Sequence, residues 1–323
     1  MNFRTEYRPA ISSLELDPQS PALLLGSCFA DNVGRRMRRS LWDATVNPCG
    51  TLFNPLSMAA AVGFALGDAV PSAPWPDADG IWRSWDFPTQ FADTSVEGCR
   101  EKCLRAVDAL REALTRSRLL VATFGTSIIY TLASQPGRVV ANCHKQPARL
   151  FETRRVPAAE TARIWISLIE RIREVNPDLD VVITVSPVRH VKDGFARNAR
   201  SKAELLLAAE MIEGATERCA YFPAFEIMTD DLRDYRFYAA DMVHPSAEAE
   251  EYIFEKFCET FIPEAGRRLL REGDALARLC AHRPLLAGSA PAVAHARLAA
   301  EAVARWRTEH PGMLAPETTD IYD

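Results

Sequence analysis

Three stretches of the chain are continuously apolar and end abruptly in small or turn-forming residues. They are LLLGS (23–27), SRLLVATFGTS (117–127) and LDVVITVSPVRH (179–190). Strands buried on both faces of a parallel sheet have this pattern, because helices cover them from both sides. The three runs therefore predict parallel strands, and ligands bind such sheets just beyond the carboxyl ends of their strands.

Helical periodicity fills the intervals between the apolar runs. Apolar residues recur at helical spacing in three segments, namely 98–117, 160–177 and 201–216. An alternation of strands and helices is typical of βαβ units. We therefore expect an α/β fold with a parallel sheet and helices on both of its faces.

Two segments depart from this alternation. Residues 67–95 are rich in proline and tryptophan, which predicts an irregular insertion over one edge of the core. Residues 263–323 hold an Ala/Arg/Leu-rich stretch and then a polar tail, which predicts a helical extension with a poorly ordered end or an interaction arm. We expect one α/β domain over 1–262, and an extension over 263–323 through which a protein partner or a second copy of the chain could bind.

Composition narrows the classes of protein to which the chain can belong. A formal net charge of −5 argues against a general nucleic-acid binder, which needs a basic face. No run reaches the roughly 18 apolar residues of a membrane span, and the N-terminus lacks the apolar segment of a secretory signal. The eight cysteines lack the spacing of a zinc site, so we expect free thiols and a cytoplasmic location.

The turn after the first apolar run presents two nucleophiles in succession, Ser27 and Cys28. A serine hydroxyl needs a base to take its proton and a carboxylate to orient that base. AADMVHPS supplies Asp241 and His244 on one short loop. The ordinary alternatives are that Ser27 caps a helix and that His244 is a surface histidine. Cys28 is the rival nucleophile, although we expect it to turn back into the sheet as a small buried residue.

Seven blocks of the sequence resemble the GSCFA family, which is named for residues 26–30 and is grouped with the SGNH/GDSL hydrolases. In order, they are GSCFADNVG, NPCGTLFNPLS, FGTSIIY, VVANCHKQPARLF, TVSPVRHVKDGF, NARSKAELL and YFPAFEIMTDDLRDYRFYAADMVHPS. The resemblance implies a three-layer α/β/α, flavodoxin-like sheet. It implies Ser27 as the nucleophile, with Asp241 orienting the general base His244. It also implies that the backbone N–H of Gly50 joins that of Ser27 in an oxyanion hole.

The sequence departs from the pattern of these hydrolases at two places. Where an asparagine is expected in the third block, this chain reads GTSI (125–128). We expect Asn142, whose amide matches the missing donor, or Ser127 to replace it. The histidine expected after Asp86 is also absent. A catalytically impaired relative that only binds a ligand would show the same two departures.

Basic residues after other strands complete the set of candidates. His144 and Lys145 follow a predicted strand at 139–140, and either contact substrate or form an ordinary hydrogen-bonded loop. His190 either belongs to a cationic rim for an anionic or polyhydroxylated ligand or lies on a solvated loop.

The chain has no nucleotide-binding motif and no persuasive metal-ligand spacing, so no cofactor and no metal are expected. The resulting hypothesis is a serine esterase that cleaves O-acetyl or other short-chain acyl esters through an acyl-Ser27 intermediate. The resemblance favours a small-molecule substrate or one linked to a carbohydrate or glycolipid. With a sugar hydroxyl in place of water, the same triad would make an O-acyltransferase.

Overall fold

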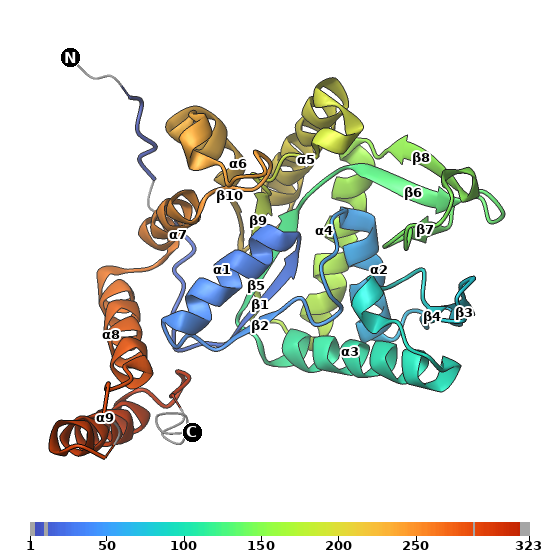
Figure 1. Cartoon of the computed structure of the whole chain (residues 1–323). Coiled ribbons are helices and arrows are strands. Elements are labelled where there is room, and N and C mark those ends of the chain that lie inside the picture. Colours follow the sequence, from blue (N-terminus) through green and yellow to red (C-terminus); the bar gives the residue numbers. More distant parts are fainter. Residues whose placement is uncertain (1–3, 10–11, 287, 317–323) are drawn as a thin grey trace.

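Five parallel strands form the central sheet. The structure is a computed structural model that describes residues 4–9, 12–286 and 288–316. The strands are β1 (Ala22–Gly26), β2 (Ala44–Val46), β5 (Leu119–Phe124), β9 (Asp180–Val185) and β10 (Cys219–Phe222), in the order β10-β9-β5-β1-β2 (Figure 1). Numbered along the chain, these five strands have the flavodoxin-like order 2-1-3-4-5. The predicted fold class is confirmed, and three of the strands arise from the three apolar runs.

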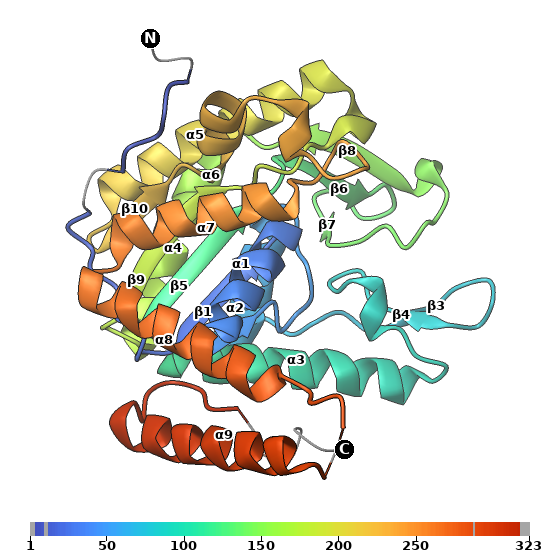
Figure 2. The ribbon, with the colours of Figure 1, turned by 60° about the vertical axis from the view of Figure 1, so that its left-hand side comes forward.

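Helices cover both faces of the sheet and bury two separate hydrophobic clusters. Along β1, Leu24 belongs to one cluster, whereas Leu23 and Leu25 belong to the other, as alternation of side chains along a strand requires. Helices α1 (Cys28–Arg39) and α7 (Ala247–Phe261) pack on the first face. The second face carries α2 (Pro55–Leu66), α3 (Val96–Arg116), α4 (Ala158–Val175) and α5 (Phe195–Ala215) (Figures 1 and 2).

The strand order places a crevice at the carboxyl ends of β1 and β5. The connection after β1 leads to β2 on one side of β1, whereas the next strand of the sheet, β5, lies on its other side. At such a reversal of strand order the helices diverge and leave room for a ligand. The residues that follow these two strands, Ser27 and Gly125, therefore lie where this fold binds ligands.

Two small sheets flank the carboxyl end of the central sheet. The three-stranded antiparallel sheet β7-β6-β8 consists of β6 (Ile128–Leu132), β7 (Val139–Val140) and β8 (Phe151–Arg155). The segment expected to be irregular contains a short antiparallel pair, β3 (Trp75–Pro76) and β4 (Trp82–Arg83), and a 3₁₀ turn η1 (Thr89–Phe91). Both sheets lie at the right of Figure 1.

Short helical turns complete the α/β region. They are η2 (Ala148–Leu150), η3 (Val191–Asp193), α6 (Ala224–Glu226), the π-helical η4 (Ile227–Leu232) and η5 (Tyr235–Phe237). None of the helices in the described ranges has both the length and the hydrophobicity that a membrane span requires.

The C-terminal helices α8 (Glu264–Ala281) and α9 (Ala290–Glu309) dock on the far end of α1 (Figures 1 and 2). Gly273 approaches the chain at Ser40 so closely that a Cβ atom would lie 2.4 Å from the Ser40 carbonyl oxygen. After α9 the chain folds back, and Leu314 N–H donates to Leu41 O at 2.7 Å. The first seven residues of the predicted polar tail thus pack on the protein, and residues 317–323 lie outside the described residues. The domain boundary at 262 stays a prediction.

Candidate active site

Ser27 lies at the sharp turn between β1 and α1. Gly26 has φ +134°, and a Cβ atom there would lie 2.1 Å from the Thr123 carbonyl oxygen, so only glycine allows this close passage to β5. Ser27 is the N-cap of α1, and its Oγ accepts from Phe29 N–H at 3.3 Å. The capping role and the predicted nucleophilic role therefore fall on the same hydroxyl. Ser27 is fully buried, with 0% of its surface exposed.

A polar brace from the β2 loop fixes this turn. Gly26 N–H donates to Asn47 Oδ1 at 2.8 Å, and Asn47 Nδ2 donates to Asp31 Oδ1 at 2.8 Å. Thr51 Oγ1 donates to the other oxygen of Asp31 at 3.1 Å. Sequence reasoning missed this brace, because nothing in the spacing of Asp31 and Asn47 indicates that the two side chains meet.

Asp241 and His244 form a compact pair on the loop before α7. Asp241 Oδ1 accepts from the backbone N–H groups of Val243 and His244 at 2.9 and 3.0 Å. His244 Nδ1 donates to Asp241 Oδ2 at 2.7 Å, which leaves Nε2 of the neutral ring as an acceptor. The hydrogen bond from His244 holds the pKa of Asp241 at about 2, so its carboxylate is ionised at neutral pH.

Contacts between α7 and α1 hold this pair close to the Ser27 turn. Arg36 of α1 donates to Ala247 O at 2.8 Å and forms an ion pair with Glu251 at 3.0 Å. Asn32 Nδ2 donates to Glu250 of α7. Since His244 lies three residues before the first residue of α7, these contacts set its position relative to the residues at the start of α1.

His244 and Cys28, the neighbour of Ser27, line one cavity of about 410 Å³. Most of its wall is apolar or uncharged, and the described lining residues include two cations, Arg189 and Lys192, and no carboxylate. The lining residues are Cys28, Phe53, Asn54, Thr126, Ile128, Tyr130, Val140, Ala141, Asn142, Cys143, Val188, Arg189, His190, Lys192, Val243 and His244. The structure thus brings the neighbourhood of Ser27 and the predicted base to one cavity.

His190, on the loop after β9, lies beside Ser27 at the Gly125 turn. A Cβ atom on Gly125 would lie 3.4 Å from His190 Nε2 and 3.4 Å from Ser27 Cβ, so both side chains border one point. His190 Nε2 is buried and has no hydrogen-bond partner in the structure. Burial lowers the pKa of His190 to about 4, with Lys202 and His244 contributing. The imidazole is therefore neutral at neutral pH rather than part of a cationic rim.

Lys202 of α5 is buried, and its amine contacts the turn that follows β5. Its Nζ donates to Gly125 O at 2.7 Å and to Ser186 O at 2.6 Å, which ties the ends of β5 and β9 together. Sequence reasoning missed Lys202. A signal was present, because Lys202 falls on the helical stripe that continues through Leu205, Ala209 and Ile212, all of them buried.

The predicted oxyanion-hole residues have other partners in this structure. Gly50 N–H donates to Asn47 O at 2.7 Å within the β2 loop. Ser127 is fully buried, and its hydroxyl and backbone N–H both donate to Ser201 Oγ, at 3.2 and 2.8 Å. Asn142 lines the cavity, and its Oδ1 accepts from His144 N–H at 2.7 Å. Of the three, only Asn142 presents its side chain to the cavity.

The remaining sequence candidates divide between structural contacts and the cavity. His144 is buried against Trp75 and Trp85, and its Nε2 bonds Ser84 O at 2.7 Å. Lys145 is exposed and is not among the residues that line the cavity. Cys28 is half-buried: it packs against the apolar cluster on the α1 face of the sheet and also lines the cavity, and burial raises the pKa of its thiol. A thiol with a raised pKa is a poor nucleophile.

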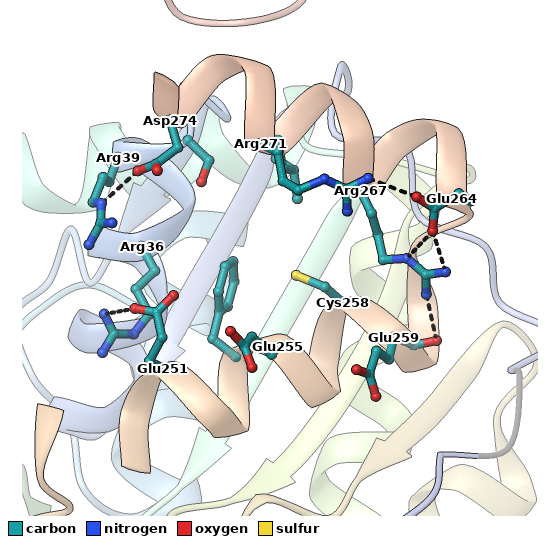
Figure 3. A pocket seen from close by; sticks show the side chains of 13 residues that line it. Arg36, Arg39, Glu251, Glu255, Cys258, Glu259, Glu264, Arg267, Arg271 and Asp274 are labelled. Carbon is teal, nitrogen blue, oxygen red and sulfur yellow. Dashed lines mark hydrogen bonds and ion pairs between the residues drawn. The ribbon is translucent and has the colours of Figure 1, made fainter. Parts of the chain in front are cut away.

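A larger cavity, of about 600 Å³, lies between α1, α7 and α8, on the same side of the molecule as the basic end of α1 (Figure 3). Its charged side chains largely neutralise one another: Arg39 pairs with Asp274 at 2.7 Å, and Arg271 with Glu264 at 2.7 Å. None of the residues after the strands of the sheet lines it. Because its charges are paired and it lies away from the carboxyl ends of the strands, this cavity is separate from the candidate active site at Ser27.

The family model described as "GSCFA family" matches residues 21–257. No curated protein matches the chain. Among solved structures, a carbohydrate esterase family 3 from Talaromyces cellulolyticus is similar at 8% identity and a TM-score of 0.37, over 79% of this chain and 99% of that one. Within the described ranges, no three His, Cys, Asp or Glu side chains converge as metal ligands would.

Proposed function

The chain belongs to the GSCFA family, and from this membership and the site geometry we propose that it is a serine esterase acting on acyl esters. Ser27 is the nucleophile, and the ordered pair His244–Asp241 is the proton-transfer system. The observation that carries the proposal is that His244, held by Asp241 at 2.7 Å, faces the same cavity as the N-terminal turn of the helix that Ser27 caps.

The proposed reaction runs in two halves. Ser27 Oγ attacks the carbonyl carbon of the ester while His244 Nε2 takes the hydroxyl proton, and the same proton is then given to the departing alcohol as the C–O bond breaks. A water molecule, deprotonated by His244, next attacks the acyl-Ser27 ester and releases the carboxylic acid and free Ser27. Asp241 stays ionised and stabilises the imidazolium that forms in each half.

The cavity's size and wall support a short acyl group. A volume of about 410 Å³ accommodates a compact ester, and apolar side chains such as Ile128 and Val188 suit the acyl chain. We propose O-acetyl or other short-chain esters, linked to a small molecule or to a carbohydrate or glycolipid.

A serine-directed fluorophosphonate tests the proposal directly. We expect stoichiometric labelling of wild-type protein at Ser27, and neither labelling nor hydrolysis of a short-chain aryl ester by Ser27→Ala. His244→Ala should lose hydrolysis as well, because no base then takes the proton. Cys28→Ala is the matched control and should keep both. If Cys28→Ala loses activity while Ser27→Ala keeps it, the thiol is the nucleophile and the proposal is wrong.

A second candidate function is ligand binding without turnover. The burial of Ser27 favours it, since a substrate reaches Oγ only when a side chain beside it moves. The absence of a hydrogen bond between the two described side chains of Ser27 and His244 favours it too. The same reagent discriminates between the candidates, because a protein that only binds remains unlabelled at high reagent concentration.

A further inference from the structure

The proposed esterase needs hydrogen-bond donors for the oxyanion. Asn142 lines the cavity, but the expected donors of Ser27, Gly50 and Ser127 are directed to other partners. Ser27 N–H faces Thr123 O at 3.4 Å, a long contact, and Gly50 N–H donates to Asn47 O at 2.7 Å. The hydroxyl of Ser127 is directed to Ser201 in the interior. Negative charge develops on the substrate's carbonyl oxygen during attack, so a donor close to Ser27 is required.

His190 is the polar side chain that borders Ser27 with an unused nitrogen. Its Nε2 and Ser27 Cβ both lie 3.4 Å from the point where a Cβ of Gly125 would be. His190 is also one of the residues that line the cavity shared by Cys28 and His244, where the proposed ester would bind. Nε2 is buried and unpartnered, which costs free energy unless a ligand satisfies it.

The neighbours of His190 fix the direction of its ring. Its backbone N–H donates to Asn198 Oδ1 at 3.0 Å, and the ring packs edge-on against Phe53 with centroids 5.9 Å apart. The preceding residue, Arg189, donates from its backbone to Val243 O at 3.1 Å and from its guanidinium to Met242 O at 3.1 Å. The loop that carries His190 is thereby attached to the loop that carries His244.

We propose that Nε2–H of His190 donates a hydrogen bond to the carbonyl oxygen of the substrate, and so supplies the oxyanion-hole donor that the absent asparagine would have given. This inference rests on the proposed esterase function. A neutral imidazole carries a single N–H group. That group can donate a hydrogen bond to the oxyanion without passing its proton to Ser27. Among the described contacts of His190 no carboxylate orients its ring, in contrast to His244, which separates the donor from the base.

Two substitutions of His190 distinguish hydrogen-bond donation by Nε2 from packing of the ring and from base catalysis. His190→Gln keeps an N–H donor near the position of Nε2 but removes the basic ring. His190→Phe keeps a ring of similar size against Phe53 and removes the donor. We expect His190→Phe to lower both kcat for an aryl ester and the rate constant of labelling by the fluorophosphonate, by about 10²–10³ with little change in KM. His190→Gln should stay within about tenfold of wild type.

Lys145→Ala, which changes an exposed residue outside the cavity, is the matched control and should label at the wild-type rate. Thermal unfolding of each variant shows that it is folded. Labelling of His190→Phe at the wild-type rate overturns the inference while leaving the esterase proposal in place. Loss of labelling by His190→Gln to the level of His190→Phe also overturns it, because the ring itself is then required. If wild-type Ser27 is never labelled, the proposed function fails and this inference with it.

Discussion

Replacing Lys202 with methionine should remove a rise in the stability of the protein between pH 7 and pH 9. Lys202 is 2% exposed, and burial lowers its pKa from 10.5 to about 7 in the folded state. In the unfolded chain the amine keeps its proton up to its ordinary pKa of 10.5. Between these two values the unfolded state binds more protons than the folded state, so raising the pH stabilises the folded state.

The gain in the free energy of unfolding follows from the difference between the pKa values of Lys202 in the folded and unfolded states. One pH unit corresponds to at most about 1.4 kcal/mol for a single group. Because titration of the folded state is only half complete near pH 7, the gain from pH 7 to pH 9 is about 2 kcal/mol. Methionine also leaves Gly125 O and Ser186 O without their donor, and each unsatisfied carbonyl costs about 1–3 kcal/mol.

Denaturant unfolding at pH 7, 8 and 9 measures the prediction. The quantity of interest is the difference in free energy of unfolding between wild type and Lys202→Met, since other groups that titrate in this range cancel in the difference. We expect this difference to grow by about 2 kcal/mol over the interval. Lys145→Met, at an exposed lysine, is the control and should show a constant difference. A constant difference for Lys202→Met would refute the reasoning, because it would mean that the two carbonyl oxygens keep the buried amine protonated.

Three further predictions test the site and the docking of the C-terminal helices. Asp241→Asn keeps an acceptor for two backbone N–H groups but removes the charge beside His244, so kcat should fall by up to about 10⁴ with the fold intact. Gly125→Ala places a Cβ 2.7 Å from the Phe53 carbonyl oxygen, so thermal unfolding should show a loss of about 1–3 kcal/mol together with slower labelling of Ser27. Trp306→Ala removes an indole that is 6% exposed and should cost about 3–5 kcal/mol in denaturant unfolding, and a cost near zero would mean that α9 is not docked in solution.

The parts of the fold that the sequence predicted are those with strong local periodicity. The runs at 23–27, 117–127 and 179–190 became β1, β5 and β9, because strands covered on both sides must be apolar throughout. Of the antiparallel sheet β7-β6-β8, the sequence indicated only β7, as the strand expected at 139–140, and the sheet itself was missed. Its strands are two to five residues long, and β8 reads FETRR with four exposed residues, so neither periodicity nor composition marks it.

The residues of the candidate site that belong to a local sequence motif could be predicted. Those whose position depends on packing between distant segments could not. Ser27 and the Asp241–His244 pair follow from a strand-end turn and a short loop motif, and the structure places them around one end of the sheet. The depth of His190 was not predictable, because its burial arises from Phe53 and the Gly125 turn, both distant in sequence. For Lys202, the helical stripe indicates burial but not the partners of the amine, because these are carbonyl oxygens, which any residue can supply.

The last described residues of the chain close over the end of α1, and this has a consequence for synthesis. Met37 and Leu41, near the end of α1, share an apolar cluster with Leu269, Val303 and Met313, which a ribosome makes much later. A growing chain therefore has its first strand and helix in place while one side of that helix is still uncovered. During that interval the nascent protein is open to aggregation and to chaperones, and folding of this cluster should finish only after Met313 has been synthesised.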